Sequence, residues 1–259
     1  TVVDDSLVYL PEGVPVDTTK ILGTGNYLAV GRGMTNETAG TITVGAGEKL
    51  VICGDGFTAG TAIIIAGGAI ELPFNVTVAS PVSVNPSSST AIVWRAAEAV
   101  FSGEWDINGT LIVDNQNKSD VFPAGRMVMT GTGNVRGGGV TINSGDMEFR
   151  SVGCVWTFGK ATILKQTNAA MYLGITQGAT VDLLDGVDNS AGYTAGCSAL
   201  YLPTLEITTG ATMKVGPLRQ FRLGSQHWRG HTEVIIDGGR LEINGYIGEF
   251  NSGGNGSLI

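Results

Sequence analysis

Apolar and polar residues alternate with a period of two along most of the chain, in short runs that are rich in Thr, Val and Ile and are interrupted by glycines. Such alternation is typical of β-strands that bury one face and expose the other. Amphipathic helical periodicity is nearly absent, and only residues 91–101 have a composition that suits a short helix. The pattern therefore predicts an all-β protein.

One motif recurs: an apolar-x-apolar strand, a short link containing glycine, and a second apolar-x-apolar strand. Its clearest copies are IIIAGGAIEL at 63–72 and VIIDGGRLEI at 234–243. Seven copies begin at residues 42, 63, 105, 140, 173, 205 and 234. The last four intervals are 35, 33, 32 and 29 residues, a spacing that indicates a repeat architecture.

The motif favours a β-solenoid. Two strands joined at a glycine form two sides of a coil, because glycine accepts positive φ and has no Cβ to clash with the neighbouring coil. At about 30 residues per coil the chain would make roughly eight irregular coils, about 40 Å long. The alternative is a β-sandwich of hairpins, which the turn signals Asn108-Gly109 and Asp237-Gly238 would suit. We predict a parallel β-helix over 25–250, with an N-terminal lead, cap or inter-subunit segment at 1–24 and a tail at 251–259.

The alternation also predicts which side chains face the core. Inward positions of the 63–72 copy are Ile63, Ile65, Ile70 and Leu72. Outward positions, expected to meet water, are Glu71, Glu148, Asp182, Glu206, Lys214 and Glu242. Ile64 and Ile235 are apolar at outward positions, which suggests a covering loop or a subunit contact.

The composition of the chain excludes several classes of protein. The 259 residues carry 15 Lys+Arg against 23 Asp+Glu, a net charge of −8, and only 15% are charged. An acidic balance argues against nucleic-acid binding, and 42% hydrophobic residues exclude a disordered chain. No apolar stretch is long enough to predict a transmembrane helix. Of the three cysteines, Cys53 is expected in the core, and a Cys154–Cys197 disulfide is the less favoured interpretation of the other two.

The glycine-punctuated strand pairs resemble those of right-handed parallel β-helix proteins, such as autotransporter passenger domains, surface adhesins and extracellular fibre proteins. The resemblance covers about residues 40–250 and includes no catalytic motif. It implies an extracellular or cell-surface location, with a signal peptide already removed before Thr1, and cell-surface glycans as further partners. It implies no particular chemistry.

Two histidines lie close together in Gln226-His227-Trp228-Arg229-Gly230-His231. One interpretation is a metal or sugar site with Trp228 as a stacking platform. However, the i,i+4 spacing converges on one face only in a helix, which Gly230 opposes. The preferred interpretation is a polar loop between coils.

Two oxygen-rich segments, 185–190 and 114–120, have the ligand chemistry of Ca²⁺ sites but match neither the EF-hand loop nor the calcium-binding repeat GGxGxDxUx. Solvated turns are preferred, so we expect no cofactor and no metal ligands, with structural Ca²⁺ as the weaker alternative. Gly137-Gly138-Gly139 is interpreted as a corner and not as a phosphate-binding loop. Sequons for N-glycosylation occur at Asn36, Asn75, Asn108, Asn117 and Asn255.

Polysaccharide-cleaving β-helix enzymes need clustered carboxylates, or a carboxylate-bound metal with a basic Arg or Lys. The acid pairs considered are Asp4/Asp5, Glu104/Asp106, Asp182/Asp185 and Asp185/Asp188. Glu104-Trp105-Asp106 stands out, yet alternation points Trp105 inward and both acids outward, as on a plain strand face. Arg219 and Arg222 suit contact with an acidic polymer but have no basic neighbours.

No catalytic residue is therefore assigned. The sequence favours a non-catalytic extracellular protein that assembles with itself into a surface fibre, filament or sheath. Two alternatives remain open: a carbohydrate-active or carbohydrate-binding β-helix, including the phage tailspike type, and an adhesin segment of a larger repeat protein.

Overall fold

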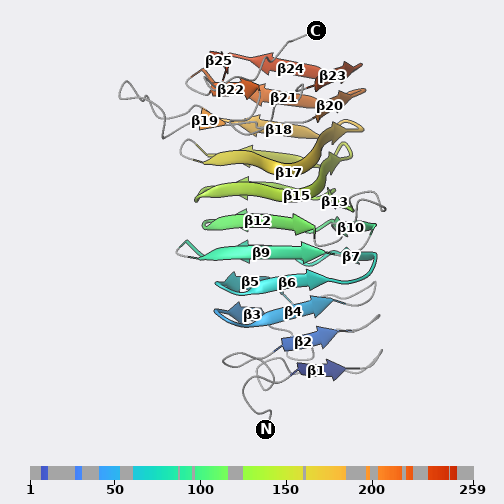
Figure 1. Cartoon of the computed structure of the whole chain (residues 1–259), viewed down its shortest axis with the longest axis vertical. Coiled ribbons are helices and arrows are strands. Elements are labelled where there is room, and N and C mark those ends of the chain that lie inside the picture. The colour runs from blue at the N-terminus through green and yellow to red at the C-terminus, as the bar shows by residue number, and fades with distance from the viewer. Residues whose placement is uncertain are drawn as a thin grey trace.

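The protein is a parallel β-solenoid. The computed structural model describes residues 7–10, 27–30, 41–52, 61–86, 88–94, 97–115, 125–159, 162–184, 197–198, 204–217, 220–223, 233–244 and 246–249. Within these ranges there are strands and turns but no helix. The strands lie one above another as rungs, from β1 at one end to β23, β24 and β25 at the other (Figure 1). Their pairing is parallel throughout the described sheets, so the predicted solenoid is confirmed and the sandwich alternative is wrong.

The strands form three sheets. The 13-stranded sheet contains β1 (Leu7–Leu10), β2 (Tyr27–Val30), β4 (Lys49–Ile52), β6 (Ala69–Leu72), β7 (Val76–Val78), β9 (Ser89–Trp94), β10 (Glu98–Phe101), β12 (Thr110–Asn115), β13 (Arg126–Met129), β15 (Gly139–Arg150), β17 (Ile163–Thr176), β20 (Thr204–Thr208) and β23 (Glu233–Asp237). The nine-stranded sheet contains β3 (Ile42–Gly45), β5 (Ile63–Ala66), β8 (Val82–Val84), β11 (Trp105–Ile107), β14 (Gly133–Val135), β16 (Val155–Phe158), β18 (Thr180–Leu183), β21 (Thr212–Val215) and β24 (Arg240–Ile243). The three-stranded sheet contains β19 (Cys197–Ser198), β22 (Gln220–Leu223) and β25 (Tyr246–Glu249).

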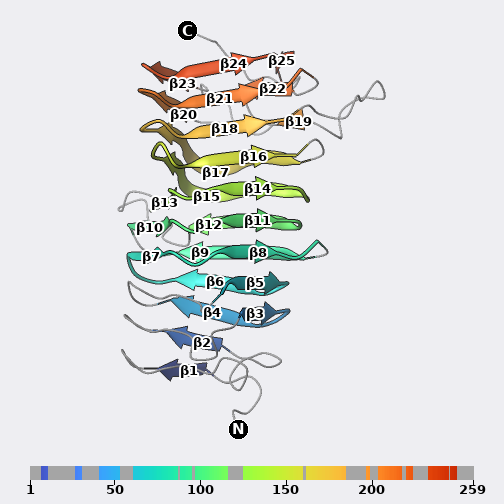
Figure 2. The ribbon, with the colours of Figure 1, turned by 180° about the vertical axis from the view of Figure 1, so that it is seen from behind.

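The coils that are described most completely, such as β8–β9–β10 and β11–β12–β13, have three faces. We call the nine-stranded sheet face one; it is seen most directly from behind (Figure 2). The 13-stranded sheet supplies face two (β1, β2, β4, β6, β9, β12 and the first halves of β15 and β17) and face three (β7, β10, β13, the second halves of β15 and β17, β20 and β23). Both β15 and β17 run through the corner between faces two and three, with register shifts at residues 142–146.

Within the described ranges, face one contains nine strands. The coils are less regular than the sequence intervals suggested. Successive partners on this face are as little as 19 residues apart, where Ile63 pairs with Val82, and as much as 32 apart, where Val181 pairs with Met213. The expectation of about 30 residues per coil is therefore wrong for the N-terminal coils.

The recurring glycine motif occupies all three corners of the coil. Its first three copies turn from face one to face two, for example from β5 to β6 at Gly67. The fourth copy bends β15 from face two to face three at Gly145, and the last three turn from face three to face one. The motif thus specifies a corner in general, because glycine adopts the positive φ that most of these corners have (+98° at Gly67, +69° at Gly238) and lacks the Cβ that would clash at others, as at Gly109, where it would lie 2.1 Å from the Ser88 carbonyl oxygen.

The core is a continuous cluster of buried apolar side chains along the rungs. Ile63, Ile65, Ile70 and Leu72 are fully buried, as predicted. At mid-stack, Trp105, Gly133 and Trp156 occupy one inward column, in register on three successive rungs. The two indole rings lean toward each other over the glycine, with ring centroids 6.2 Å apart. Because Gly133 has no side chain, it leaves space in the column for the indole rings of Trp105 and Trp156.

Several local expectations need correction. Residues 91–101, considered for a helix, contain parts of strands β9 and β10. Glu148 points outward in register but is 3% exposed, so it does not meet water. Cys154 is a buried free thiol that donates a hydrogen bond to the Met129 carbonyl (3.1 Å), so the Cys154–Cys197 disulfide is wrong. Cys53 lies outside the described residues.

Ile64 and Ile235 are partly exposed on the outer surfaces of faces one and three. Within the expected lead segment, β1 pairs in parallel with β2 and extends face two by one rung. In the described part of the chain, no helix is long and apolar enough to span a membrane.

Candidate functional site

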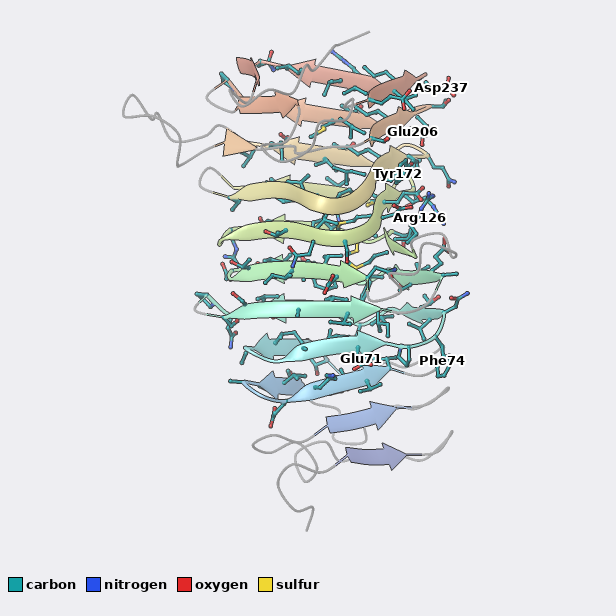
Figure 3. The ribbon with its side chains drawn as sticks, in the orientation of Figure 1. Glu71, Phe74, Arg126, Tyr172, Glu206 and Asp237 are labelled. Carbon is teal, nitrogen blue, oxygen red and sulfur yellow. The ribbon has the colours of Figure 1, made fainter. Side chains whose placement is uncertain are left out.

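Outward side chains of face three make a connected group of charges. We call it the face-three cluster; its members are Glu98, Arg126, Asp146, Glu148, Arg150, Tyr172 and Glu206. The parallel register stacks these residues on β10, β13, β15, β17 and β20. Arg126, Tyr172 and Glu206 follow one another along the same side of the rod (Figure 3).

Glu148 is the centre of the cluster. Its carboxylate accepts hydrogen bonds from Arg126 (2.8 Å), Arg150 (2.8 Å) and the Thr176 hydroxyl (2.6 Å). Burial alone would raise the pKa of Glu148, but the hydrogen bonds from Arg150 and Thr176 and the charges of both arginines bring it below its ordinary value. Arg150 also reaches Glu98 at 3.3 Å, so one guanidinium joins β10 to β15. A buried carboxylate with this many donors is held ionised.

The pKa of Asp146 is shifted in the opposite direction to that of Glu148. Burial raises the pKa of its carboxyl to about 6, and the neighbouring Glu148 adds to the rise, while Arg126 (3.8 Å) opposes it. Its Oδ1 atom is buried without a hydrogen-bond partner among the described residues. Asp146 and Glu148 thus form a pair of nearby carboxyls whose environments push their pKa values apart, the arrangement that acid–base sites use.

Tyr172 covers the next rung of the cluster. Its hydroxyl donates to Glu206 (2.7 Å), and the Arg126 guanidinium lies 4.6 Å from the ring centroid. A Cβ on Gly174 would come within 2.6 Å of the ring, so the ring lies directly over this glycine. Burial, followed by the hydrogen bond to Glu206, raises the pKa of the phenol. Arg126 and Gly174 therefore pack against the Tyr172 ring, and its hydroxyl is already engaged.

The chemistry available here is charge pairing between rungs. Arg126, Thr176 and Tyr172 bond carboxylates of neighbouring strands, whereas Arg150 bonds Glu148 of its own strand and Glu98 of β10. Sequence reasoning missed Asp146, Arg126 and Tyr172 as members of one group. The D-x-E-x-R alternation at 146–150 was an available signal for three outward charges on one strand. Alignment with Arg126 and Tyr172, in contrast, depends on the lengths of the intervening coils.

The Glu104-Trp105-Asp106 segment behaves as expected from alternation. Trp105 is fully buried, while Glu104 and Asp106 point outward on face one. Asp106 accepts two hydrogen bonds from Arg136 (Nε to Oδ1, 3.0 Å), which follows β14 on the adjacent rung. The structure therefore pairs Asp106 with a cation and does not bring it to a second acid.

Most other candidate residues lie outside the described part of the chain. This applies to His227, Trp228, His231, Arg219, the 185–190 segment and residues 116–120 of the second segment. Asp114 and Asn115 end β12, where the Ser144 hydroxyl bonds the Asp114 carboxylate and accepts from the Asn115 N–H (2.9 Å). Arg222 lies on β22, away from face three.

Gly137 and Gly138 form the corner between β14 and β15, and a Cβ on Gly137 would collide with the Asn108 carbonyl, which confirms the corner interpretation. Of the sequons, Asn75 is exposed before β7 and Asn108 is partly exposed after β11. Asn36, Asn117 and Asn255 lie outside the described residues. No group of three or more His, Cys, Asp or Glu side chains in the described ranges has a metal-binding arrangement.

No family model, curated protein or solved structure matches this chain. The fold and the geometry of its surfaces are therefore the basis for functional inference.

Proposed function

We propose that this protein is a non-catalytic structural component of an extracellular fibre, filament or sheath, and that solenoid ends stack to build it. The observation that carries the proposal is the open rung at β23 and β24. Ile236 is in register with Ile207, which is fully buried, yet Ile236 is 48% exposed. Leu241 and Ile243 likewise follow the buried Met213 and Val215 but are only partly buried.

An open rung favours association with another coil. Its inward positions are apolar, so a further coil would remove them from water, at about 25 cal/mol for each Å² buried. Uncovered strand edges also offer unpaired backbone N–H and C=O groups to an incoming strand. A second copy of this chain is the partner that a filament requires. The resemblance to surface adhesins and fibre proteins supports placing this assembly outside the cell.

The test is electron microscopy and mass in solution of the protein and two variants. Ile236→Lys puts a charge on the open rung, whereas Val152→Lys puts the same charge on a corner where the native side chain is already 81% exposed. We expect regular filaments or oligomers for the native chain and for V152K, and loss of both for I236K with an unchanged circular dichroism spectrum. A native chain that stays monomeric at high concentration would refute the proposal and would favour glycan binding as the function.

A further inference from the structure

A small hollow opens on the outer side of face one, where β18, β21 and β24 end one above another (Figure 2). Leu184, Gly216 and Asn244 follow these strands in turn, and their backbone N–H groups donate to carbonyls of the preceding rung at 2.8–3.0 Å. Gly216 has no side chain, so it leaves a gap between Leu184 and Asn244. We call this gap, whose volume is about 240 Å³, the Gly216 hollow.

Two side chains of opposite charge line the Gly216 hollow, and neither is paired within the described chain. Asp182 and Lys214 are in register on β18 and β21, yet neither forms an ion pair or a side-chain hydrogen bond with another described residue. Glu242, the next residue of this column, pairs with Arg240 of its own strand (2.9 Å). The hollow therefore presents one carboxylate acceptor and one ammonium donor side by side, with charges that cancel.

An amide and an apolar wall complete the lining. The exposed Asn244 side chain supplies a hydrogen-bond donor and an acceptor. Leu184 is 40% exposed, although leucine is among the residues most often fully buried. Binding sites for small organic groups combine apolar surface with a few polar groups that fix the orientation of the ligand. The Gly216 hollow has this combination.

We propose that the Gly216 hollow binds one neutral hexose residue of a polysaccharide. The C–H face of the sugar ring packs against Leu184, and adjacent hydroxyl groups donate to Asp182 and accept from Lys214 and Asn244, because each hydroxyl is both a donor and an acceptor. The hollow is smaller than the roughly 300–1,000 Å³ of pockets for drug-sized molecules, so it accommodates a single ring.

The charges favour a neutral sugar over an acidic one. Asp182 and Lys214 cancel within the hollow, and the whole chain carries a net charge of −8, which repels a polyanion. The site is also separate from the proposed assembly contact. It faces outward, so a coil stacked over β24 leaves it accessible to a polysaccharide chain.

The experiment is isothermal titration calorimetry of the full chain with neutral tetrasaccharides built from glucose, galactose, mannose or N-acetylglucosamine. Asp182→Ala removes the acceptor, Lys214→Met removes the donor, and Gly216→Leu fills the gap. The matched control is Asp106→Ala, which removes the same carboxylate from the same outward column of face one, three rungs away from Asp182. Circular dichroism and urea midpoints verify that each variant is folded.

We expect the native chain to bind at least one of these sugars, with nearly the same affinity at about 50 and about 500 mM salt because the ligand is uncharged. D182A and K214M should each bind about tenfold more weakly, since each loses a hydrogen bond to a charged group. G216L should show no binding, and D106A should bind like the native chain.

Binding of none of the tetrasaccharides overturns the inference, and so does binding that D182A and G216L leave unchanged. Selective binding of trigalacturonate that weakens steeply with salt also overturns it, because the ligand is then an anion. Selective binding of free leucine, whose ammonium group would pair with Asp182, has the same consequence. Filaments of G216L should match those of the native chain, so failure of this inference and failure of the proposed function are distinguishable.

Discussion

Gly133 offers a sharp test of how the core is built. Substitution by alanine would place a Cβ 2.5 Å from Trp156 Cε3 and closer still to two other carbons of that ring. Ordinary carbon contacts are about 3.5–4.0 Å, so the ring or the strand must move by about 1 Å. Movement is resisted because Trp156 packs against Trp105, Phe149 and Phe158, and its Nε1 donates to the Gly131 carbonyl at 3.1 Å.

The expected cost is the sum of two effects. Overpacking of a filled core typically costs about 1–3 kcal/mol. Displacing the indole also weakens its buried hydrogen bond, worth about 1 kcal/mol. We therefore expect Gly133→Ala to lower the free energy of unfolding by about 2–4 kcal/mol. Urea titration followed by circular dichroism measures it, with the slope of the transition checked because stacked coils need not unfold in a single step.

Two controls separate the clash from other effects of replacing glycine. Gly153→Ala adds a Cβ that meets nothing within 4 Å, so its unfolding midpoint should stay near that of the native chain. In a Trp156→Leu background the ring is gone, and Gly133→Ala should then cost less than about 1 kcal/mol. The reasoning is refuted if Gly133→Ala costs the same in both backgrounds, or costs no more than Gly153→Ala.

The face-three cluster and the buried thiol give three further predictions. The pKa of the Asp146 carboxyl is raised from 3.8 to about 6, so ionising it in the folded chain lowers the free energy of unfolding as pH rises from about 4 to 6. Asp146→Asn should abolish that fall and stabilise the chain by about 1–2 kcal/mol at pH 7. Urea titrations at several pH values measure this. The pKa of Glu148 is lowered, so its contribution is lost progressively as pH falls below about 4.5. Glu148→Gln should therefore destabilise the chain by about 2–4 kcal/mol at pH 7 and by less at pH 3, and equal loss at both values would contradict this. Burial raises the pKa of Cys154 to about 12, so iodoacetamide at pH 8 should label its peptide only after denaturant is added, as mass spectrometry can test; labelling of the native chain would show that the thiol is accessible.

The sequence predicted the core better than the surface, for a physical reason. Whether a residue points inward depends only on alternation within its own strand, so Ile63, Ile65 and Trp105 were placed correctly from a few neighbouring letters. Whether two outward residues meet depends on the length of every loop between them. Arg126 and Glu148 are 22 residues apart and Asp106 and Arg136 are 30 apart, and no fixed period relates the two distances.

The same argument explains why the sequence reveals the repeat but does not reveal which corner of the coil each copy occupies. Glycine corners look alike in sequence because the steric requirement is the same wherever three short faces join. The copies at 105 and 140 therefore read as neighbours in one series, although the first turns out of face one and the second turns into face three. Only strand register, which is a property of the stack, distinguishes the corners.

The low charge content follows from the stacking geometry and bears on how the solenoid ends. In a column with one side chain about every 4.8 Å, a charge is stable when its neighbours are neutral or opposite, so a long stack accommodates few charges and arranges them in pairs. Lys49 with Glu71 and Arg136 with Asp106 fit this rule, and 15% charged residues overall is the composition that it favours. Glu233 and Asp237 form no ion pair with a described residue, and their in-register neighbours Thr204 and Thr208 are neutral, so they also have no like charge in their columns. Apolar burial favours association at this rung, because the inward Ile236 is 48% exposed there.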